Sequence, residues 1–135
     1  MDFQQSLMIS AAGLRAQSVR MRIIAENMAN QSSIADSENQ DPYRRKTISF
    51  KNVLDRELGV NTVKVERIGF DKSDFGQKYD PGHPAANEDG YVRTTNVNGI
   101  VETMDLRQAQ RSYESNLNAI EAAKNMMART VELLR

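Results

Sequence analysis

Apolar residues recur at every seventh position near the C-terminal end of the chain. This C-terminal apolar stripe consists of Leu106, Tyr113, Ile120, Met127 and Leu134. A second series, three positions further on, is small or polar, and this C-terminal small stripe consists of Ala109, Asn116, Ala123 and Thr130. A seven-residue apolar repeat is typical of a helix that packs along another helix. The pattern therefore predicts a long helix over residues 98–135 whose small side chains allow a partner to approach closely.

The same repeat occurs at the start of the chain. The N-terminal apolar stripe consists of Leu7, Leu14, Met21 and Met28, and Phe3 and Ile24 flank it. Asp2 and Gln5 have the spacing of a capping box, which predicts a helix from Phe3 to Met28 or Ala29. Asn30 is then expected to end this helix in the left-handed conformation. Two heptad helices of similar length are expected to pack against each other as a coiled coil, and against copies of themselves.

Two residues bear on how closely the helices approach. Gly13 lies inside the first predicted helix, where glycine costs about 1 kcal/mol relative to alanine. Close backbone approach is the favoured reason for this glycine, and a tolerated glycine on an exposed face is the alternative. Asn116 either fixes the register of the helix pair or faces solvent.

The middle of the chain predicts short strands. Polar and apolar side chains alternate over residues 43–50, which is typical of a half-exposed strand. A second strand is expected from Val60 through Val65 toward Phe70. Residues 52–58 are expected to form a helical turn or an irregular run. Residues 71–90 show no periodicity and predict a long loop, and Asp89-Gly90 then predicts a turn into a third strand at residues 91–94.

These elements define a mainly α fold with a small β-containing middle. Asn98 is expected to cap the last helix, and Glu102 is favourable in its early turns. We expect one domain of residues 1–30 together with 98–135, and a middle segment of residues 31–97.

Composition excludes several function classes. Eighteen basic and eighteen acidic residues balance, so there is no net charge to attract nucleic acid. No apolar run is long enough for membrane insertion, and there is no cysteine for disulfides or thiolate chemistry. The first residues lack a basic region and an apolar region, so we expect no cleaved secretory signal.

No group of residues has the spacing of a catalytic, cofactor or metal site. The basic cluster Arg44-Arg45-Lys46 lacks a glycine-rich loop, and it is expected to be solvated or to form ion pairs, with Asp36, Glu38 and Asp41 close by to neutralise it. His83 is the only histidine and has no sequence-near ligand. The chain is therefore expected not to be an enzyme and to have no cofactor.

Four segments together resemble one known family. They are AGLRAQ at residues 12–17 with NMAN at 27–30, PYRRK at 42–46, YDPGHPA at 79–85 with DGYV at 89–92, and NVN at 96–98 followed by Met104, Ala109, Arg111, Tyr113, Glu114, Asn116 and Lys124. In this combination the chain resembles the flagellar basal-body rod proteins, and the third segment points to the proximal-rod group. Thr95 departs from the proline that is usual in the family.

The resemblance implies a structural subunit that assembles into a helical tube, transmits torque and lines the export channel. It implies partners among copies of the chain, other flagellar rod subunits and the basal-body export-gate or adaptor proteins. It also implies export by the flagellar type III apparatus and a place in the rod, in the periplasmic space. The alternative is a soluble coiled-coil adaptor or secreted effector that binds one helical partner.

The predicted assembly interface follows the apolar stripes. It consists of Leu7, Leu14, Met21, Ile24, Met28, Leu106, Tyr113, Asn116, Leu117, Ile120, Met127, Val131 and Leu134. Leu117 and Val131 lie one position beyond the C-terminal small stripe, and they are expected to meet the next subunit.

Overall fold

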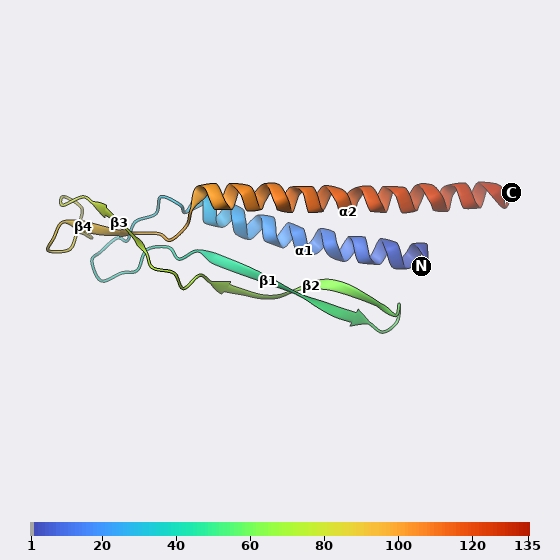
Figure 1. Cartoon of the computed structure of the whole chain (residues 1–135), viewed down its shortest axis with the longest axis horizontal. Helices are drawn as coiled ribbons and strands as arrows, with labels where there is room; N and C mark the ends of the chain where they lie inside the picture. Colours follow the sequence, from blue (N-terminus) through green and yellow to red (C-terminus); the bar gives the residue numbers. More distant parts are fainter. Residues whose placement is uncertain (1) are drawn as a thin grey trace. The chain divides into compact units, whose positions relative to one another are not determined.

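A computed structural model describes residues 2–135 of the chain (Figure 1). The elements in order are α1 (Phe3–Ala29), β1 (Lys46–Asp55), β2 (Val60–Phe70), β3 (Gly76–Tyr79), β4 (Tyr91–Thr94) and α2 (Gly99–Leu133). The strands form two separate two-stranded sheets, β1 with β2 and β3 with β4. The fold is therefore mainly α with a small β-containing middle, as the sequence predicts.

The chain divides into two compact units, and each contains part of both helices. The first unit consists of residues up to 21, residues 48–67 and residues 107–135, and the second of residues 22–47 and 68–106. The domain boundaries expected from the sequence stay a prediction.

In the first unit, α1 lies antiparallel to α2 at short distance. A Cβ atom placed on Gly13 would lie only 2.7 Å from Nδ2 of Asn116, which confirms the predicted close approach. About two turns further along α1, the Arg20 guanidinium donates a hydrogen bond of 3.1 Å to Oε1 of Gln108. Supercoiling of the two helices stays a prediction.

The β1–β2 hairpin packs on another side of α1. The strands run in opposite directions and are joined at a turn in which Gly59 has a φ of 65° and donates to the Asp55 carbonyl. The Gln5 side chain on α1 donates to the Leu58 carbonyl in the same turn, at 2.9 Å. Glycine suits this position because a positive φ is strained for residues with a Cβ atom.

The structure corrects both expected ends of β1. Residues 52–55 continue the strand instead of forming a helical turn, because Val53 lies beside β2 and its carbonyl accepts from the Thr62 hydroxyl. The strand begins at Lys46 and not at Tyr43, since the Arg45 backbone N–H donates to the Asn96 side chain at 2.7 Å.

In the second unit, residues 71–90 are not a loop throughout. Residues of β3 pair with β4 in antiparallel register, from Gly76 opposite Thr94 to Tyr79 opposite Tyr91. The sequence did not reveal β3 because its four residues are all exposed and have no apolar alternation. Gly90 has a φ of 84°, which confirms the predicted turn before β4. A small apolar cluster of Ala35, Ala85 and Val92, with Ile34 against it, is buried beside this sheet.

The ends of the two helices agree in part with the ends predicted from the sequence. Oδ1 of Asn98 accepts from the backbone N–H groups of Ile100 and Val101, so Asn98 caps α2 as predicted. The Gln5 side chain accepts from the Asp2 backbone N–H, as in a capping box. Asn30 is not left-handed, because among residues 2–135 only glycines have a positive φ. Instead, both its backbone N–H and its side chain donate to the Glu26 carbonyl, which leaves α1 right-handed to its end.

We expect Gly13→Leu to lower the free energy of unfolding by about 1–3 kcal/mol, because the new side chain would occupy the place of Asn116. Urea denaturation followed by circular dichroism measures the change. Ala25→Leu is the matched control, since Ala25 is exposed on the same helix and leucine there should change stability by less than about 0.5 kcal/mol. Equal effects of the two substitutions would contradict the close approach.

Candidate functional site

The contact between the helices in the first unit is made by small and polar side chains. Ser6 and Ala123 line the same hollow, and the Asn116 side chain lies against Gly13. Ala109 and Ala123, both from the C-terminal small stripe, are buried to 0% and 5% exposure. Residues of the apolar stripes from Leu7 to Ile120 are half-buried, and their packing between the helices stays a prediction. This leaves part of each apolar stripe available on the surface of the helix pair.

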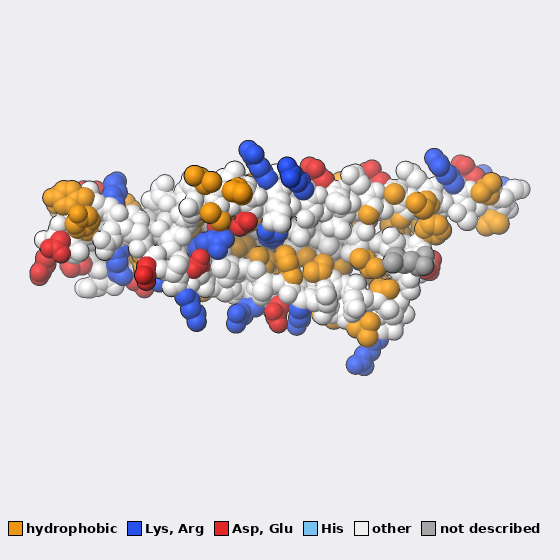
Figure 2. Space-filling view, in the orientation of Figure 1, with side chains coloured by type: hydrophobic (Ala, Val, Ile, Leu, Met, Phe, Trp, Pro, Cys, Tyr) orange, Lys and Arg blue, Asp and Glu red, His pale blue; other side chains and the backbone are white. Residues whose placement is uncertain are grey.

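The end of α2 extends past the start of α1. Asp2, Phe3 and Ser6 at the start of α1 line a hollow of about 340 Å³ together with Ala119, Ala122, Ala123 and Met126 of α2. Beyond this point all residues from 124 to 135 are exposed. We call residues 127–134 the α2 extension. Figure 2 shows apolar side chains gathered along it, and Val131 and Leu134 are 59% and 83% exposed.

The predicted interface residues fall into three groups by burial. Ile24 is buried. Leu7, Leu14, Met21, Met28, Leu106, Tyr113, Asn116 and Ile120 are half-buried. Leu117, Met127, Val131 and Leu134 are exposed. The structure thus brings the first two groups into or beside the fold and leaves the third group as free apolar surface.

A buried polar network lies at the centre of the second unit. The side chain of Glu102 is 0% exposed, and it accepts hydrogen bonds from Nε of Arg45 and from Nδ2 of Asn27, the latter at 3.3 Å. The Asn27 amide also bonds both the backbone N–H and the carbonyl of Lys46, each at 2.9 Å. The Tyr43 hydroxyl donates to Oδ1 of Asn27 at 2.8 Å. One asparagine and one glutamate therefore connect the end of α1, the start of β1 and the first turn of α2.

The charges of this network stabilise one another. Burial by itself would lower the pKa of Arg45, but the bond to Glu102 and the nearby carboxylates of Asp71 and Asp105 raise it above its usual value. Hydrogen bonds from Ser73, together with Arg45, lower the pKa of Asp71. Burial and then the charges of Glu26 and Glu102 raise the pKa of Tyr43. Each of these three pKa shifts favours the form that Arg45, Asp71 and Tyr43 ordinarily have near neutral pH.

Arg45 and Lys46 of the basic cluster form ion pairs, which was one of the two alternatives expected from the sequence. Their partners are not the acidic residues that directly precede the cluster. Arg45 pairs with Glu102, Asp71 and Asp105, and Lys46 pairs with Glu26. Arg44 donates to the carbonyls of Asp71 and Ser73 and lies over the Phe75 ring at 4.2 Å. Asp41 pairs instead with Arg93.

Sequence reasoning missed Asn27, Arg45 and Glu102 as a connected group. One signal was present, because Glu102 lies seven residues before Ala109 and thus continues the C-terminal small stripe toward the start of α2. Asn27 lies fourteen residues after Gly13, so it occupies the corresponding position on α1. The partners from residues 43–46 carry no such signal.

Residues 2–135 show neither a metal site nor a membrane-spanning helix. No three His, Cys, Asp or Glu side chains in this range are grouped so that they could hold a metal ion. Neither described helix is long and apolar enough to cross a membrane.

Comparison with known proteins identifies the family. A family model described as the C-terminal region of flagellar basal body rod FlgEFG proteins matches residues 88–133. The flagellar basal-body rod protein FlgC of Agrobacterium fabrum is 46% identical over 94% of this chain and 91% of its own length. The FlgC proteins of Bacillus subtilis and Salmonella typhimurium are 39% and 35% identical, over 95% and 93% of this chain and 95% and 92% of their own lengths. The chain belongs to the FlgC family of flagellar basal-body rod proteins.

Membership defines the class of function. The protein is a structural component of the flagellar basal-body rod, and its family is not enzymatic. None of these relatives is a single-partner adaptor or a secreted effector, so that alternative has no support. Thr95, at which the resemblance led us to expect proline, is buried, and its hydroxyl accepts from the Val97 backbone N–H at 3.3 Å.

We expect Glu102→Ala to cost about 3 kcal/mol of stability, because it leaves the Arg45 guanidinium and the Asn27 amide without their shared acceptor. Asp41→Ala is the matched control, since its pair with Arg93 is exposed and contributes less than about 1 kcal/mol. Urea denaturation of the two variants measures the difference. Similar losses would show that the buried network is not the stronger interaction.

We expect the stabilising effect of the Asp71 carboxylate to depend on pH. Because its pKa lies below the usual 3.8, the charged form stabilises the fold above that value, and the contribution is lost as the pH falls through the lowered pKa. Asp71→Asn should therefore be less stable than wild type by up to about 1 kcal/mol near pH 7 and equally stable in strong acid. Urea denaturation across this range is the measurement, with Asp74→Asn as an exposed control. A difference that does not change with pH would contradict the assignment.

Proposed function

We propose that this chain builds the rod by packing its terminal helices against copies of itself and against other flagellar rod subunits. The observation that carries the proposal is the α2 extension, an apolar helix end with no part of α1 beside it. Full burial of an exposed apolar side chain such as Leu134, which is 83% exposed, stabilises it by about 1.5–3 kcal/mol relative to full exposure. A neighbouring subunit that covers such side chains would recover much of this.

Continuity with the existing helix contact supports this role. The C-terminal small stripe runs from Ala123, which is buried against α1, to Thr130, which is exposed. The C-terminal apolar stripe likewise runs from half-buried Ile120 to exposed Met127. The surface that packs on α1 thus continues in the same pattern for about two further turns, and a helix of another subunit can use it in the same way.

The geometry favours an open assembly. In the first unit, the α2 extension and the surfaces of α1 are different patches, so a contact between them joins unlike surfaces. Such heterologous contacts produce helical filaments when the rotation does not close. This fits a helical tube that transmits torque and lines an export channel.

The partners and the place of assembly rest on the family. We infer that basal-body export-gate or adaptor proteins contact the subunit in addition to other rod subunits. We also infer assembly in the periplasmic space after export without a cleaved signal peptide. The motifs at residues 12–17 and 96–98 support these points because they are shared among rod and hook proteins.

We expect Val131→Asp to prevent rod assembly, because it places a charge in the apolar surface of the α2 extension. Complementation of a strain that lacks the natural subunit, scored by motility and by isolation of basal bodies, measures the effect. Asn125→Asp adds the same charge at an exposed polar position of the same helix and should leave motility unchanged. Normal basal bodies with Val131→Asp, at normal protein levels, would refute the role of the extension.

A further inference from the structure

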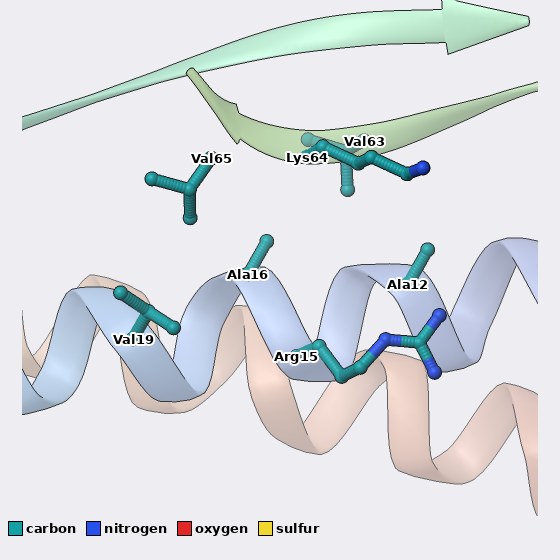
Figure 3. Close-up of a pocket in the computed structure, with 7 residues that line it drawn as sticks. All are labelled: Ala12, Arg15, Ala16, Val19, Val63, Lys64 and Val65. Atoms are coloured by element: carbon teal, nitrogen blue, oxygen red, sulfur yellow. The ribbon is translucent and has the colours of Figure 1, made fainter. Parts of the chain in front are cut away.

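A small apolar groove lies in the first unit between α1 and β2. Ala12, Ala16 and Val19 of α1 and Val63 and Val65 of β2 line it. Figure 3 shows Ala12 and Ala16 pointing from the helix toward the strand, and Val63 and Val65 pointing back toward the helix. The alanines are too short to close the space, which leaves an opening of about 190 Å³.

The size and chemistry of the groove fit one aliphatic side chain. A cavity of about 150 Å³ holds a benzene-sized group, so this opening has room for a leucine side chain. Its walls offer only methyl and methylene groups between the helix and the strand. No buried polar side chain lines it to orient a polar ligand.

Two cations border the groove. Arg15 of α1 and Lys64 of β2 complete its lining, and both are exposed. Within residues 2–135, neither side chain forms an ion pair. The groove is therefore an apolar opening beside two positive charges that form no ion pair with the residues the structure describes.

The matching surface lies on α2 of the same chain. Leu117 is 41% exposed, and Glu114 and Glu121 lie three residues before it and four after it. Residues at these spacings are neighbours on one helix face, so Leu117 projects between two carboxylates. Both glutamates are exposed and, within the described chain, unpaired. Among the exposed large apolar residues of the described helices, Leu117 alone has carboxylates on both sides at this spacing.

We propose that Leu117 of a second copy of this chain inserts into the groove between α1 and β2, with Glu114 and Glu121 of that copy next to Arg15 and Lys64. The occupant follows from complementarity, because an apolar projection between two anions meets an apolar opening beside two cations. The contact joins unlike surfaces, so in a helical assembly it can repeat from copy to copy.

This contact deepens the proposed function and rests on it, but it uses a different surface from the α2 extension. It gives the β1–β2 hairpin a role in assembly, because Val63, Val65 and Lys64 supply one wall of the groove. It also gives the middle and the end of α2 different contacts, with Leu117 entering a groove and Val131 packing on a helix of another subunit.

Site-specific disulfides test the contact directly, since the chain contains no cysteine. Cells that produce Val63→Cys and Leu117→Cys chains together should give basal bodies in which the two chains cross-link after mild oxidation. We expect the mixed product to exceed either homodimer at least tenfold. Lys51→Cys, exposed on β1, replaces Val63→Cys in the control and should give only background with Leu117→Cys.

A charge exchange tests the complementarity. Arg15→Glu with Lys64→Glu in the Val63→Cys chain should reduce cross-linking at least tenfold. Glu114→Lys with Glu121→Lys in the Leu117→Cys chain should restore it. Such restoration is not expected if the first pair of substitutions simply unfolds the protein.

The outcomes separate this inference from the proposed function. Basal bodies that form normally but cross-link no better than the Lys51→Cys control would overturn the groove contact and leave assembly through the α2 extension intact. A predominance of homodimers between two Leu117→Cys chains would overturn it as well, because it indicates like surfaces in contact. Val131→Asp tests the proposed function independently of these cross-links.

Discussion

The carboxylate of Glu102 is completely buried, and the second unit depends on how that charge is satisfied. Removing an ionised carboxylate from water costs several kcal/mol unless it is paired and hydrogen-bonded. Arg45 and Asn27 must therefore both be in place, which fixes the last turn of α1, the residues that enter β1 and the first turn of α2. Asn27 adds two bonds to the backbone of Lys46 and so aligns the start of the strand.

The first unit depends on a different constraint, which is the small size of the side chains between its helices and its hairpin. Gly13 and Ala109 let α1 and α2 approach closely, while Ala12 and Ala16 face the hairpin and leave the groove under it. The larger apolar residues are displaced to the sides and to the α2 extension. A chain that buried them within itself would be a better monomer and would have less apolar surface to offer a neighbour. The distribution of side-chain size in the first unit therefore suits a subunit of an assembly.

Periodicity predicted the elements with strong local patterns and failed where contacts are distant in sequence. Both helices, the cap at Asn98 and the close approach at Gly13 follow from spacing along the chain. The role of the apolar stripes in the helix contact stays a prediction, and Gly13, Ala109 and Ala123 are buried in the first unit. The network was not predictable, because Arg45 and Glu102 are 57 residues apart and nothing local pairs them. Polar strand β3 was missed because its order comes from pairing with β4.

The residues buried in this chain are mostly alanine or polar, including Ser10, Asn27, Thr62, Thr95 and Glu102. Exposure of apolar surface raises the heat capacity on unfolding, and exposure of polar surface lowers it. The heat-capacity change per residue should therefore lie below the ~12–15 cal/mol/K of ordinary globular proteins. A smaller change flattens the curve of stability against temperature. The free energy of unfolding of the subunit would then vary little over a wide temperature range, which suits a structural component that must keep its shape at different temperatures.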